Sequence, residues 1–568
     1  MNAVICSLNS KYIHSSLAPW CLFAGVKEYC ESDINASVIE GTINEPINNI
    51  IDRIIKLNPD VVGFCTYIWN VSKVYEIVKS IKKSLPKAVI ILGGPEVSYN
   101  AEEVLFNNKL IDFVLSGEGE KSFPELLTSI NTNSDYKKIE GICYRDEKNI
   151  VVNPPCILSS DPVSPYTKEF FDSLNGRISY LETSRGCPYS CAFCLSGRCG
   201  NARFFDIERA KNDIILLANS GTKTIKLVDR TFNANKKRAK ELFQFIIDNY
   251  GVKIPSNVCI HFEIAGDILD DETIEILSKS PIGAIQMEIG LQSFNEKTLT
   301  YINRKTNIKR LKSNIEKLIK SHNIHIHIDL IAGLPFEDLE SFKDSFNTAF
   351  LLYPNMLQLG FLKLLHGADM RENAEKYPCE FSKNPPYEVK STPWMNENSL
   401  SIIHLLEDAL DRIYNSGRFK RTINYLINEV KIAPFDLFFG ISDYLKSVDT
   451  DKISLDKYTD YLFNYLTSLD NADKKIIRDL MVCDRLSTNP SGTLPKSLQI
   501  EDKNLKRYKT LLNIKVNPVH NIKRGIAILY SLDELVFVDY INKNPISGEF
   551  EINVVPLSEL LEMTFKGL

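Results

Sequence analysis

The stretch "ISYLETSRGCPYSCAFC", residues 178–194, sets an apolar strand directly before three closely spaced cysteines. Cys187, Cys191 and Cys194 follow the spacing C-x3-C-x2-C. A closed structural zinc site usually takes four ligands in paired groups, and here the second pair is missing. Thiolates at this spacing suit an iron–sulfur cluster instead. A four-iron cluster held by three cysteines leaves one iron open, and Cys199 is then a bystander.

The same strand opens a series of alternating strands and helices over residues 178–370. The further strands that we expect are "TIKLVD" (224–229), "CIHFEIA" (259–265), "AIQMEIG" (284–290), "HIHIDLIAG" (325–333) and "LQLGFLKLL" (357–365). Six strands with helices between them predict a partial (β/α)6 barrel. Polar residues at the strand ends, such as Glu263, Gln292 and Asp329, are then expected to point into the mouth of the barrel.

Residues 1–135 show a second strand–helix alternation. Its strands are expected at "AVICSL" (3–8), "ASVIEG" (36–41), "VVGFCTY" (61–67), "AVIILGG" (88–94) and "FVLSG" (113–117). This pattern predicts a parallel, doubly wound, Rossmann-like sheet. Ligands in such sheets bind beyond the carboxyl ends of the strands, so the turns there form the expected rim of a site.

The remaining parts of the chain carry no catalytic motif. Residues 136–177 predict a β-hairpin and a linker, and residues 371–568 predict a mainly helical extension that ends in short strands. We therefore expect an α/β protein of three domains.

Composition excludes several classes of function. The 568 residues carry a net charge of −5, with 44% hydrophobic and 24% charged residues, as in ordinary globular proteins. The chain has no run of like charges that is long enough to indicate a nucleic-acid partner. No apolar run is long enough to span a membrane, and the N-terminus does not resemble a signal peptide, so we expect a cytoplasmic protein with reduced thiols.

The cysteine motif resembles that of the radical S-adenosylmethionine (SAM) superfamily. The spacing, the preceding strand and Phe193 before the third cysteine carry the resemblance. It implies a [4Fe-4S] cluster on Cys187, Cys191 and Cys194, whose open iron binds SAM. An electron from the cluster then cleaves SAM to a 5′-deoxyadenosyl radical, which abstracts a hydrogen atom from the substrate.

Three later segments resemble the branch that includes the anaerobic coproporphyrinogen oxidases. They are "HFEIAGDIL", "MEIGLQSFNEKTLTYINRKT" and "IDLIAGLPFED". This resemblance implies that SAM is bound by Glu263, Gln292, Arg304 and Asp329, and the resemblance of the cysteine motif adds Phe193. Carboxylates can accept hydrogen bonds from the ribose or ammonium group, and a guanidinium can neutralise a carboxylate.

The second barrel strand departs from the superfamily pattern. It reads "KLVDRTFN" where a Gly-Gly-Glu motif is expected. Asp229 stands at that place and is a further candidate for the amino group of SAM.

The N-terminal part resembles the cobalamin-binding class of the superfamily. The resemblance rests on "SLNSKYIHSSLA" (7–18), "VVGFCTYIWN" (61–70), "LGGPEVS" (92–98) and "LSGEGEKSFPELL" (115–127). It implies cobalamin binding by Leu8, Asn9, Gly63, Tyr67, Gly93, Gly94, Glu96, Gly117, Glu118 and Gly119. The glycines would let the backbone approach a large flat ligand.

One cobalamin motif is missing from the sequence. Many cobalamin proteins use Asp-x-His-x-x-Gly, whose histidine coordinates cobalt, and the chain has no such segment. We therefore expect cobalamin without a histidine lower ligand. The lower face would be empty, or met by water or by an uncharged side chain from the turn 67–70.

The resemblance implies a cobalamin-dependent radical SAM enzyme that methylates an unactivated carbon. The alternative is radical cyclisation or rearrangement without methyl transfer. An RNA methylthiotransferase would need a second cluster on early cysteines such as Cys6, Cys21 and Cys30, but Cys6 lies within an apolar strand. A non-catalytic cobalamin sensor would not need the three cysteines. The substrate is expected to be a small molecule or a peptide, and the electron donor a ferredoxin or flavodoxin.

Overall fold

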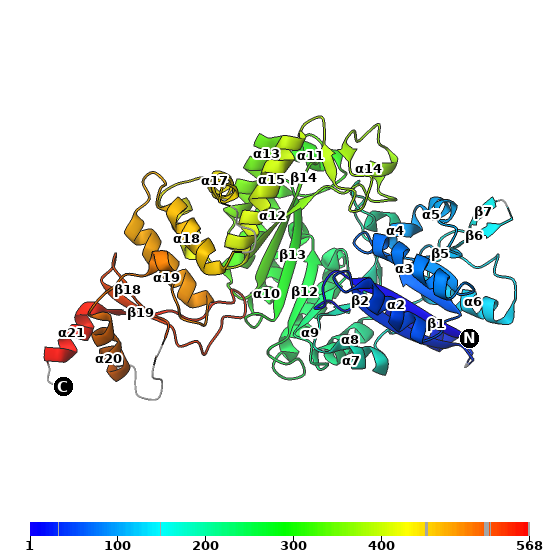
Figure 1. Cartoon of the computed structure of the whole chain (residues 1–568), viewed down its shortest axis with the longest axis horizontal. Coiled ribbons are helices and arrows are strands. Elements are labelled where there is room, and N and C mark those ends of the chain that lie inside the picture. Colours follow the sequence, from blue (N-terminus) through cyan, green and yellow to red (C-terminus); the bar gives the residue numbers. More distant parts are fainter. Residues whose placement is uncertain (32, 148, 449–452, 516–521, 523, 566–568) are drawn as a thin grey trace.

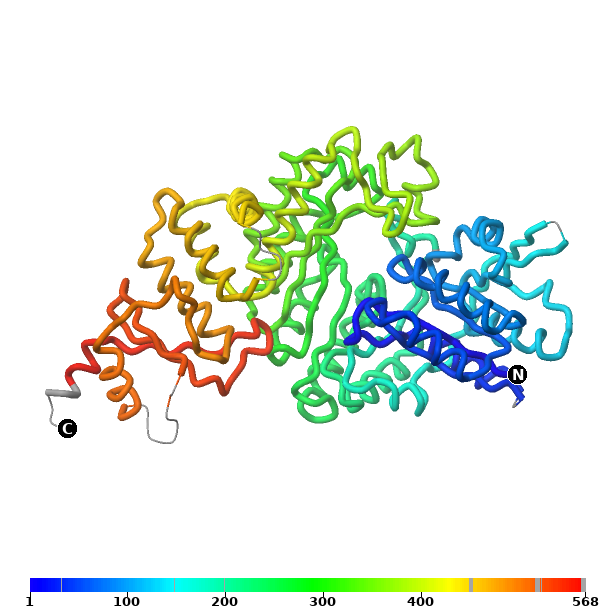
Figure 2. Tube along the Cα trace, in the orientation of Figure 1, coloured from blue at the N-terminus to red at the C-terminus, as the bar shows by residue number. Residues whose placement is uncertain are grey.

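The computed structural model describes all residues except 32, 148, 449–452, 516–521, 523 and 566–568. The chain has three parts that follow one another along its longest axis (Figure 1). The N-terminal α/β part and the C-terminal part lie at opposite ends, with the barrel between them (Figure 2). No helix in the described ranges has both the length and the apolar composition needed to cross a bilayer.

The N-terminal part is built on a seven-stranded sheet of order β2-β1-β3-β4-β5-β6-β7. Its strands are β1 (Asn2–Asn9), β2 (Asn35–Thr42), β3 (Val61–Cys65), β4 (Val89–Gly93), β5 (Phe113–Leu115), β6 (Ile142–Asp146) and β7 (Asn149–Val152). The first five are parallel. The helices between them are α1 (Ala18–Tyr29), α2 (Ile47–Lys56), α3 (Val71–Ser84), α4 (Pro95–Ser98), α5 (Ala101–Asn107) and α6 (Gly119–Thr132). The predicted doubly wound sheet is confirmed.

The predicted hairpin belongs to this sheet. Strand β6 pairs antiparallel with β5, and β7 pairs antiparallel with β6. The sequence analysis placed the hairpin with the linker, because the change from parallel to antiparallel pairing leaves no mark in the local pattern. The connection onward includes α7 (Lys168–Leu174).

The central part is a six-stranded parallel sheet of order β15-β14-β13-β12-β11-β8. Its strands are β8 (Ser179–Leu181), β11 (Thr224–Leu227), β12 (Cys259–Ile264), β13 (Ile285–Gln292), β14 (His325–Ala332) and β15 (Met356–Phe361). The main helices between them are α8 (Ile207–Ala218), α9 (Lys236–Asn249), α10 (Asp271–Ser278), α12 (Ile308–Lys320) and α13 (Leu339–Phe350). This is the predicted partial (β/α)6 barrel.

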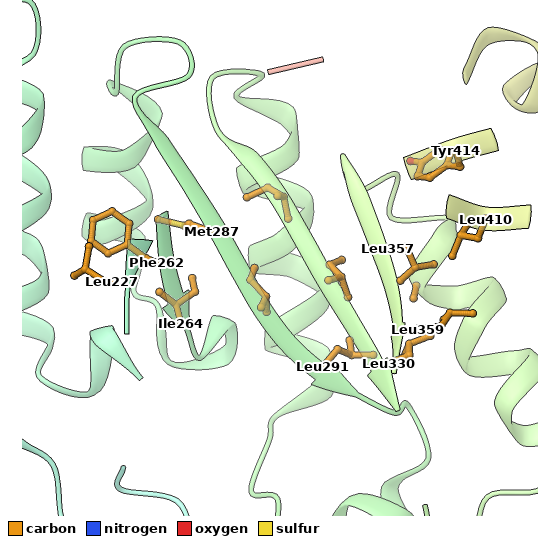
Figure 3. Close-up of a cluster of buried hydrophobic side chains, with 14 of the residues drawn as sticks. Leu227, Phe262, Ile264, Met287, Leu291, Leu330, Leu357, Leu359, Leu410 and Tyr414 are labelled. Carbon is orange, nitrogen blue, oxygen red and sulfur yellow. The ribbon is translucent and has the colours of Figure 1, made fainter. Parts of the chain in front are cut away.

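Alternate residues of the barrel strands form an apolar cluster. Phe262, Met287 and Leu330 are fully buried in it, as are their counterparts on the other strands (Figure 3). Successive side chains of a strand point to opposite faces, so the residues between them face the other side of the sheet. These intervening residues are polar at several positions and build the site described below.

The C-terminal part is mainly helical, as predicted. Its helices include α15 (Glu397–Leu410), α16 (Lys420–Asn428), α17 (Pro434–Lys446), α18 (Leu455–Leu466), α19 (Lys474–Thr488), α20 (Leu505–Lys515) and α21 (Leu557–Phe565). Strands β18 (Ile526–Leu529), β19 (Glu534–Phe537) and β20 (Asn553–Pro556) form a small antiparallel sheet near the end of the chain.

One buried carboxylate joins the N-terminal sheet to the barrel. Arg177, just before β8, donates to both oxygens of Glu40 on β2 at 2.8 and 3.2 Å. The same carboxylate accepts hydrogen bonds from Trp20 Nε1, Asn9 Nδ2 and the backbone of Ser16. The side chains of Arg177 and Glu40 are 8% and 9% exposed. The pair is therefore buried and fully hydrogen-bonded, which is the condition under which losing one partner is most costly.

We predict that Glu40→Ala lowers the free energy of unfolding by about 3–5 kcal/mol, because it leaves a buried guanidinium without a counter-charge. Urea unfolding of the full chain, followed by far-UV circular dichroism, measures the change. Glu169→Ala is the control, because its ion pair with Lys27 is about half exposed and should contribute no more than about 1 kcal/mol. Equal losses in the two variants would contradict the assignment.

Candidate active site

The loop that carries the three cysteines contains little regular structure. It follows the short strand β9 (Ser184–Arg185) and runs into the 3-10 turn η1 (Ser196–Cys199). Gly186 enters it at φ 87°, and a Cβ there would meet the backbone oxygens of Asn201 and Gly200 at 2.8 and 2.9 Å. Only glycine fits both the conformation and the space.

The three thiols line one cavity of about 210 Å³. Cys187, Cys191 and Cys194 are all free, and Cys191 is buried. Burial raises the pKa of the Cys191 thiol, and the neighbouring Arg304 guanidinium opposes this shift. Three reduced thiols facing one cavity form a donor set that suits an iron–sulfur cluster with an open iron. The Cys199 side chain lies outside the described part of the chain.

The cavity also contains most of the residues predicted to bind SAM. Phe193, Glu263, Gln292, Arg304 and Asp329 line it together with the cysteines. Gln292 has φ 73°, in the left-handed region that is uncommon for a residue with a side chain. This conformation follows a register shift between Gly290 and Gln292 at the end of β13.

Arg304 contacts both the cysteine loop and the barrel. Its guanidinium donates to the Gly290 carbonyl at 2.7 Å and to the Cys191 sulfur at 3.8 Å. It is thus a fixed positive charge beside a thiol ligand, within reach of a carboxylate bound in the cavity.

Asp229 is placed differently from the other candidates. It is 1% exposed, and its oxygens accept from Thr183 N at 2.9 Å, Thr183 Oγ1 at 2.7 Å and Ser184 Oγ at 2.5 Å. Burial raises the pKa of this carboxyl to about 6, and the three hydrogen bonds oppose the shift. The oxygens of Asp229 are thus occupied by Thr183 and by Ser184 at the start of β9, and Asp229 is not among the residues that line the cavity beside the thiols.

A larger cavity of about 650 Å³ lies between the N-terminal sheet and the barrel. The candidates Asn9, Gly63, Tyr67, Gly93, Gly94, Gly117, Glu118 and Gly119 line it. They stand at or beyond the carboxyl ends of β1, β3, β4 and β5, apart from Gly63 within β3. Gly94 has φ 112°, and a Cβ there would meet the Thr66 carbonyl oxygen at 2.4 Å.

Two residues predicted to bind cobalamin do not line this cavity. The Leu8 side chain is fully buried in the core of the N-terminal part, and its carbonyl accepts from Trp69 and Asn70. Glu96 is 6% exposed and is hydrogen-bonded to the Tyr387 hydroxyl from the segment after the barrel. Both predictions followed the position in the turn, which does not tell which way a side chain points.

The rim of the larger cavity carries a pair of stacked aromatic rings. Tyr67 and Trp69, from the turn 67–70, lie with ring centres 4.4 Å apart and an angle of 4° between the rings. His14 also lines the cavity, and its Nδ1 is hydrogen-bonded to the Tyr180 hydroxyl at 2.7 Å.

The sequence analysis missed the residues on the barrel side. Tyr180, Glu182, Arg185, Lys226 and Arg230 line the larger cavity, and Tyr189, Thr231 and Glu288 line the smaller one. The sequence pattern could have identified two of these residues. Lys226 and Glu288 alternate with apolar residues in their predicted strands, which places them on the face opposite the apolar core.

Three family models match successive parts of the chain. "B12 binding domain" matches residues 21–127, "Radical SAM superfamily" matches 181–349, and "Protein of unknown function (DUF4080)" matches 375–534. The first two fall within the two parts of the chain whose residues line the larger cavity. The chain thus contains a B12-binding domain followed by a radical SAM domain, the combination that is expected of the cobalamin-binding radical SAM family. The predicted resemblance is confirmed.

Relatives of this family share the first two parts of the chain. The cobalamin-dependent radical SAM methyltransferase TokK of Streptomyces tokunonensis is 28% identical over 318 residues, which are 53% of this chain and 46% of TokK. The anaerobic magnesium-protoporphyrin IX monomethyl ester cyclase of Rubrivivax gelatinosus is 26% identical over 328 residues, 54% of this chain and 57% of the cyclase. The chain thus matches about half the length of these relatives.

A solved structure extends the likeness in fold. The cobalamin-dependent SAM radical enzyme OxsB, solved with aqua-cobalamin and SAM bound, matches with a TM-score of 0.58 at 14% identity. The match covers 91% of this chain and 81% of OxsB. At this identity it shows that the two chains share the fold.

We predict that Cys191→Ala abolishes formation of 5′-deoxyadenosine from SAM, because two thiolates do not hold the cluster with one open iron. Anaerobic incubation with SAM and dithionite, followed by liquid chromatography, measures the product. Cys483→Ala, which removes a buried thiol in α19, should keep the activity. Undiminished cleavage by the Cys191 variant would show that the cluster lies elsewhere.

We predict that Asp229→Asn lowers the iron content per chain, because the amide presents only one acceptor to Thr183 and Ser184. Hydrogen bonds to a charged group contribute about 1.5–3 kcal/mol each, and their loss loosens the cysteine loop. SAM affinity of the fraction that carries a cluster should not change. Normal iron with weakened SAM binding would instead make Asp229 a SAM ligand, as the sequence suggested.

Proposed function

We propose that the chain is a cobalamin-dependent radical SAM enzyme that methylates an unactivated carbon of its substrate. The observation that carries this proposal is that the two cavities meet. Arg230 and Glu263 line both the cavity of the three thiols and the larger cavity at the N-terminal sheet. Molecules bound in the two cavities would therefore be neighbours. When bound, the cluster and SAM supply a radical, and the corrin supplies a methyl carrier.

The residues of the smaller cavity divide into two roles. Cys187, Cys191 and Cys194 would hold the [4Fe-4S] cluster, with Arg304 as a positive charge beside them. Glu263 and Asp329 would accept hydrogen bonds from the ammonium and ribose groups of SAM, while Phe193 and Gln292 complete the wall. Burial raises the pKa of Glu263 and that of Asp329, so each carboxylate is stabilised by gaining a hydrogen-bond donor.

The larger cavity would bind cobalamin without a histidine lower ligand. Its backbone turns at Gly93, Gly94 and Gly117 leave room for a flat ring system. His14 is engaged with Tyr180, whereas the stacked Tyr67 and Trp69 offer an uncharged aromatic surface from the turn that we predicted. We propose that this aromatic pair contacts the ligand where other cobalamin proteins place a histidine.

A second candidate function is radical cyclisation without methyl transfer. It is favoured by the match to a cyclase of comparable coverage. The other two alternatives have less support. Cys6 is fully buried in one apolar cluster while Cys30 packs against another, so these thiols do not converge on a second cluster. A sensor would not need the cavity of three free thiols.

We also propose a cellular compartment, an electron donor and a class of substrate for this enzyme. Reduced thiols and a cluster fit an anaerobic cytoplasm. The proposed electron donor is a ferredoxin or flavodoxin, and the proposed substrate is a small molecule or peptide rather than a nucleic acid.

The products that the enzyme forms from SAM distinguish the two candidate functions. We predict that protein loaded with cluster and cobalamin converts SAM to both S-adenosylhomocysteine and 5′-deoxyadenosine under reducing anaerobic conditions. With methyl-deuterated SAM, the corrin should also gain the labelled methyl group, measured by mass spectrometry. Formation of 5′-deoxyadenosine alone would overturn methylation in favour of rearrangement.

Gly93→Leu is the control variant that should block cobalamin binding and leave the cluster site unchanged. A Cβ at Gly93 meets its nearest neighbours at an ordinary 3.7 Å, so a larger side chain fills the cavity without backbone strain. This variant should keep its cluster and its 5′-deoxyadenosine formation but should neither retain cobalamin nor form S-adenosylhomocysteine.

A further inference from the structure

The interior of the barrel contains a cluster of titratable residues that the proposed function does not use. Closed (β/α)8 barrels are usually filled with branched aliphatic side chains. Here Lys226, His261, Glu288 and His327 stand on four successive strands, β11 to β14. In the register of the sheet, Lys226 is beside His261 and Glu288 is beside His327. Their apolar neighbours in sequence, such as Phe262 and Met287, belong to the buried apolar cluster of Figure 3, and successive side chains of a strand point to opposite faces.

Two imidazoles and one carboxylate of this cluster lie close together. His261 Nε2 is 3.2 Å from Glu288 Oε2, and His327 Nδ1 is 3.9 Å from the same oxygen. One ligand atom from each of the three residues lies within 4.8 Å of the other two. Tetrahedral ligands at about 2.1 Å from a metal lie roughly 3.4 Å apart, so a small contraction would bring all three into one coordination sphere.

The two histidines are buried without a complete set of hydrogen bonds. His261 and His327 are 4% and 6% exposed. His261 Nδ1 has no hydrogen-bond partner among the described residues. His327 Nε2 lies 2.9 Å from Asp329 Oδ1, but the two atoms are not aligned for a hydrogen bond. Buried polar groups without partners are uncommon and need a physical explanation.

We propose that His261, Glu288 and His327 bind a divalent transition-metal ion of the Zn²⁺ or Fe²⁺ type. Two neutral imidazoles and a carboxylate are a ligand set that such ions prefer, and three protein ligands leave a coordination position open. Asp329 Oδ1 lies 2.9 Å from His327 Nε2, so a small rotation would let this carboxylate orient a metal-bound histidine. Because Glu288 and Asp329 also line the cavity of the thiols, this second metal site adjoins the proposed SAM site.

Lys226 would compete with the metal ion for the carboxylate of Glu288. Its Nζ lies 3.2 Å from Glu288 Oε2, where it supplies the positive charge that the carboxylate needs. Lys226 also lines the larger cavity, so its ammonium group has space to turn toward solvent when an ion replaces it. Removing the lysine charge should therefore strengthen metal binding, which a purely structural ion pair would not do.

The test is equilibrium dialysis of the full chain against ⁶⁵Zn²⁺. The cluster and cobalamin are loaded first, so that the three cysteines are not free to bind zinc. We expect one equivalent of zinc on the wild-type chain. His261→Ala, His327→Ala and Glu288→Gln should each weaken binding by more than the roughly 10–100-fold that an outer-shell loss causes. Lys226→Met should tighten it by at least about tenfold.

His325→Ala is the matched control. His325 lies on β14 two residues before His327, on the same face of the sheet but outside the three-residue cluster. This variant should bind zinc like the wild type. Absence of zinc from the wild-type chain would overturn the proposal, as would equal losses in the His325 and His261 variants. The experiment measures metal content in the absence of SAM, so its result does not depend on whether the proposed methylation is correct.

Discussion

The six parallel strands of the barrel do not close into a ring, so the sheet has two edges that other parts of the chain must cover. The β8 edge is covered by the N-terminal part, where Ile178 exchanges backbone hydrogen bonds with Ile13 and Ser15. The β15 edge is covered by the C-terminal part, where the Asn415 side chain bonds both the N–H and the carbonyl of Leu357. An open barrel therefore depends on both of its neighbours.

Covering the β8 edge also determines where the cavities lie. The Glu40–Arg177 pair fixes the N-terminal sheet so that the ends of its parallel strands face the barrel interior. At the junction of the two cavities Arg230 lies 3.8 Å from Glu263. Both residues line both cavities, so the pair lies between the two proposed binding sites. Stability and the proposed chemistry thus depend on the same arrangement of the two sheets.

The sequence predicted the elements of this arrangement better than its contacts. The strands, the three cysteines and the turn glycines follow from local patterns. Leu8 and Glu96 lie away from the lining of the larger cavity for one reason, since a turn position does not reveal which way its side chain points. Asp229 stood at the expected place in the motif, but its partners Thr183 and Ser184 lie about 45 residues away, and only the fold brings them together.

The cysteine loop shows why residues beyond the barrel are needed at the site. The loop lacks a strand or helix across its three thiols, so its backbone is held by isolated hydrogen bonds. Ala192 donates to Ile302 and accepts from Met370, which belongs to the segment after β15. Arg198 donates to the Gly367 carbonyl in that segment, and Tyr387 further along reaches Glu96 of the N-terminal part. The loop is thus held by the barrel and by a segment that is itself anchored to the N-terminal sheet. These contacts compensate for the missing regular structure of the loop, and they tie the proposed cluster site to residues that lie far from the cysteines in sequence.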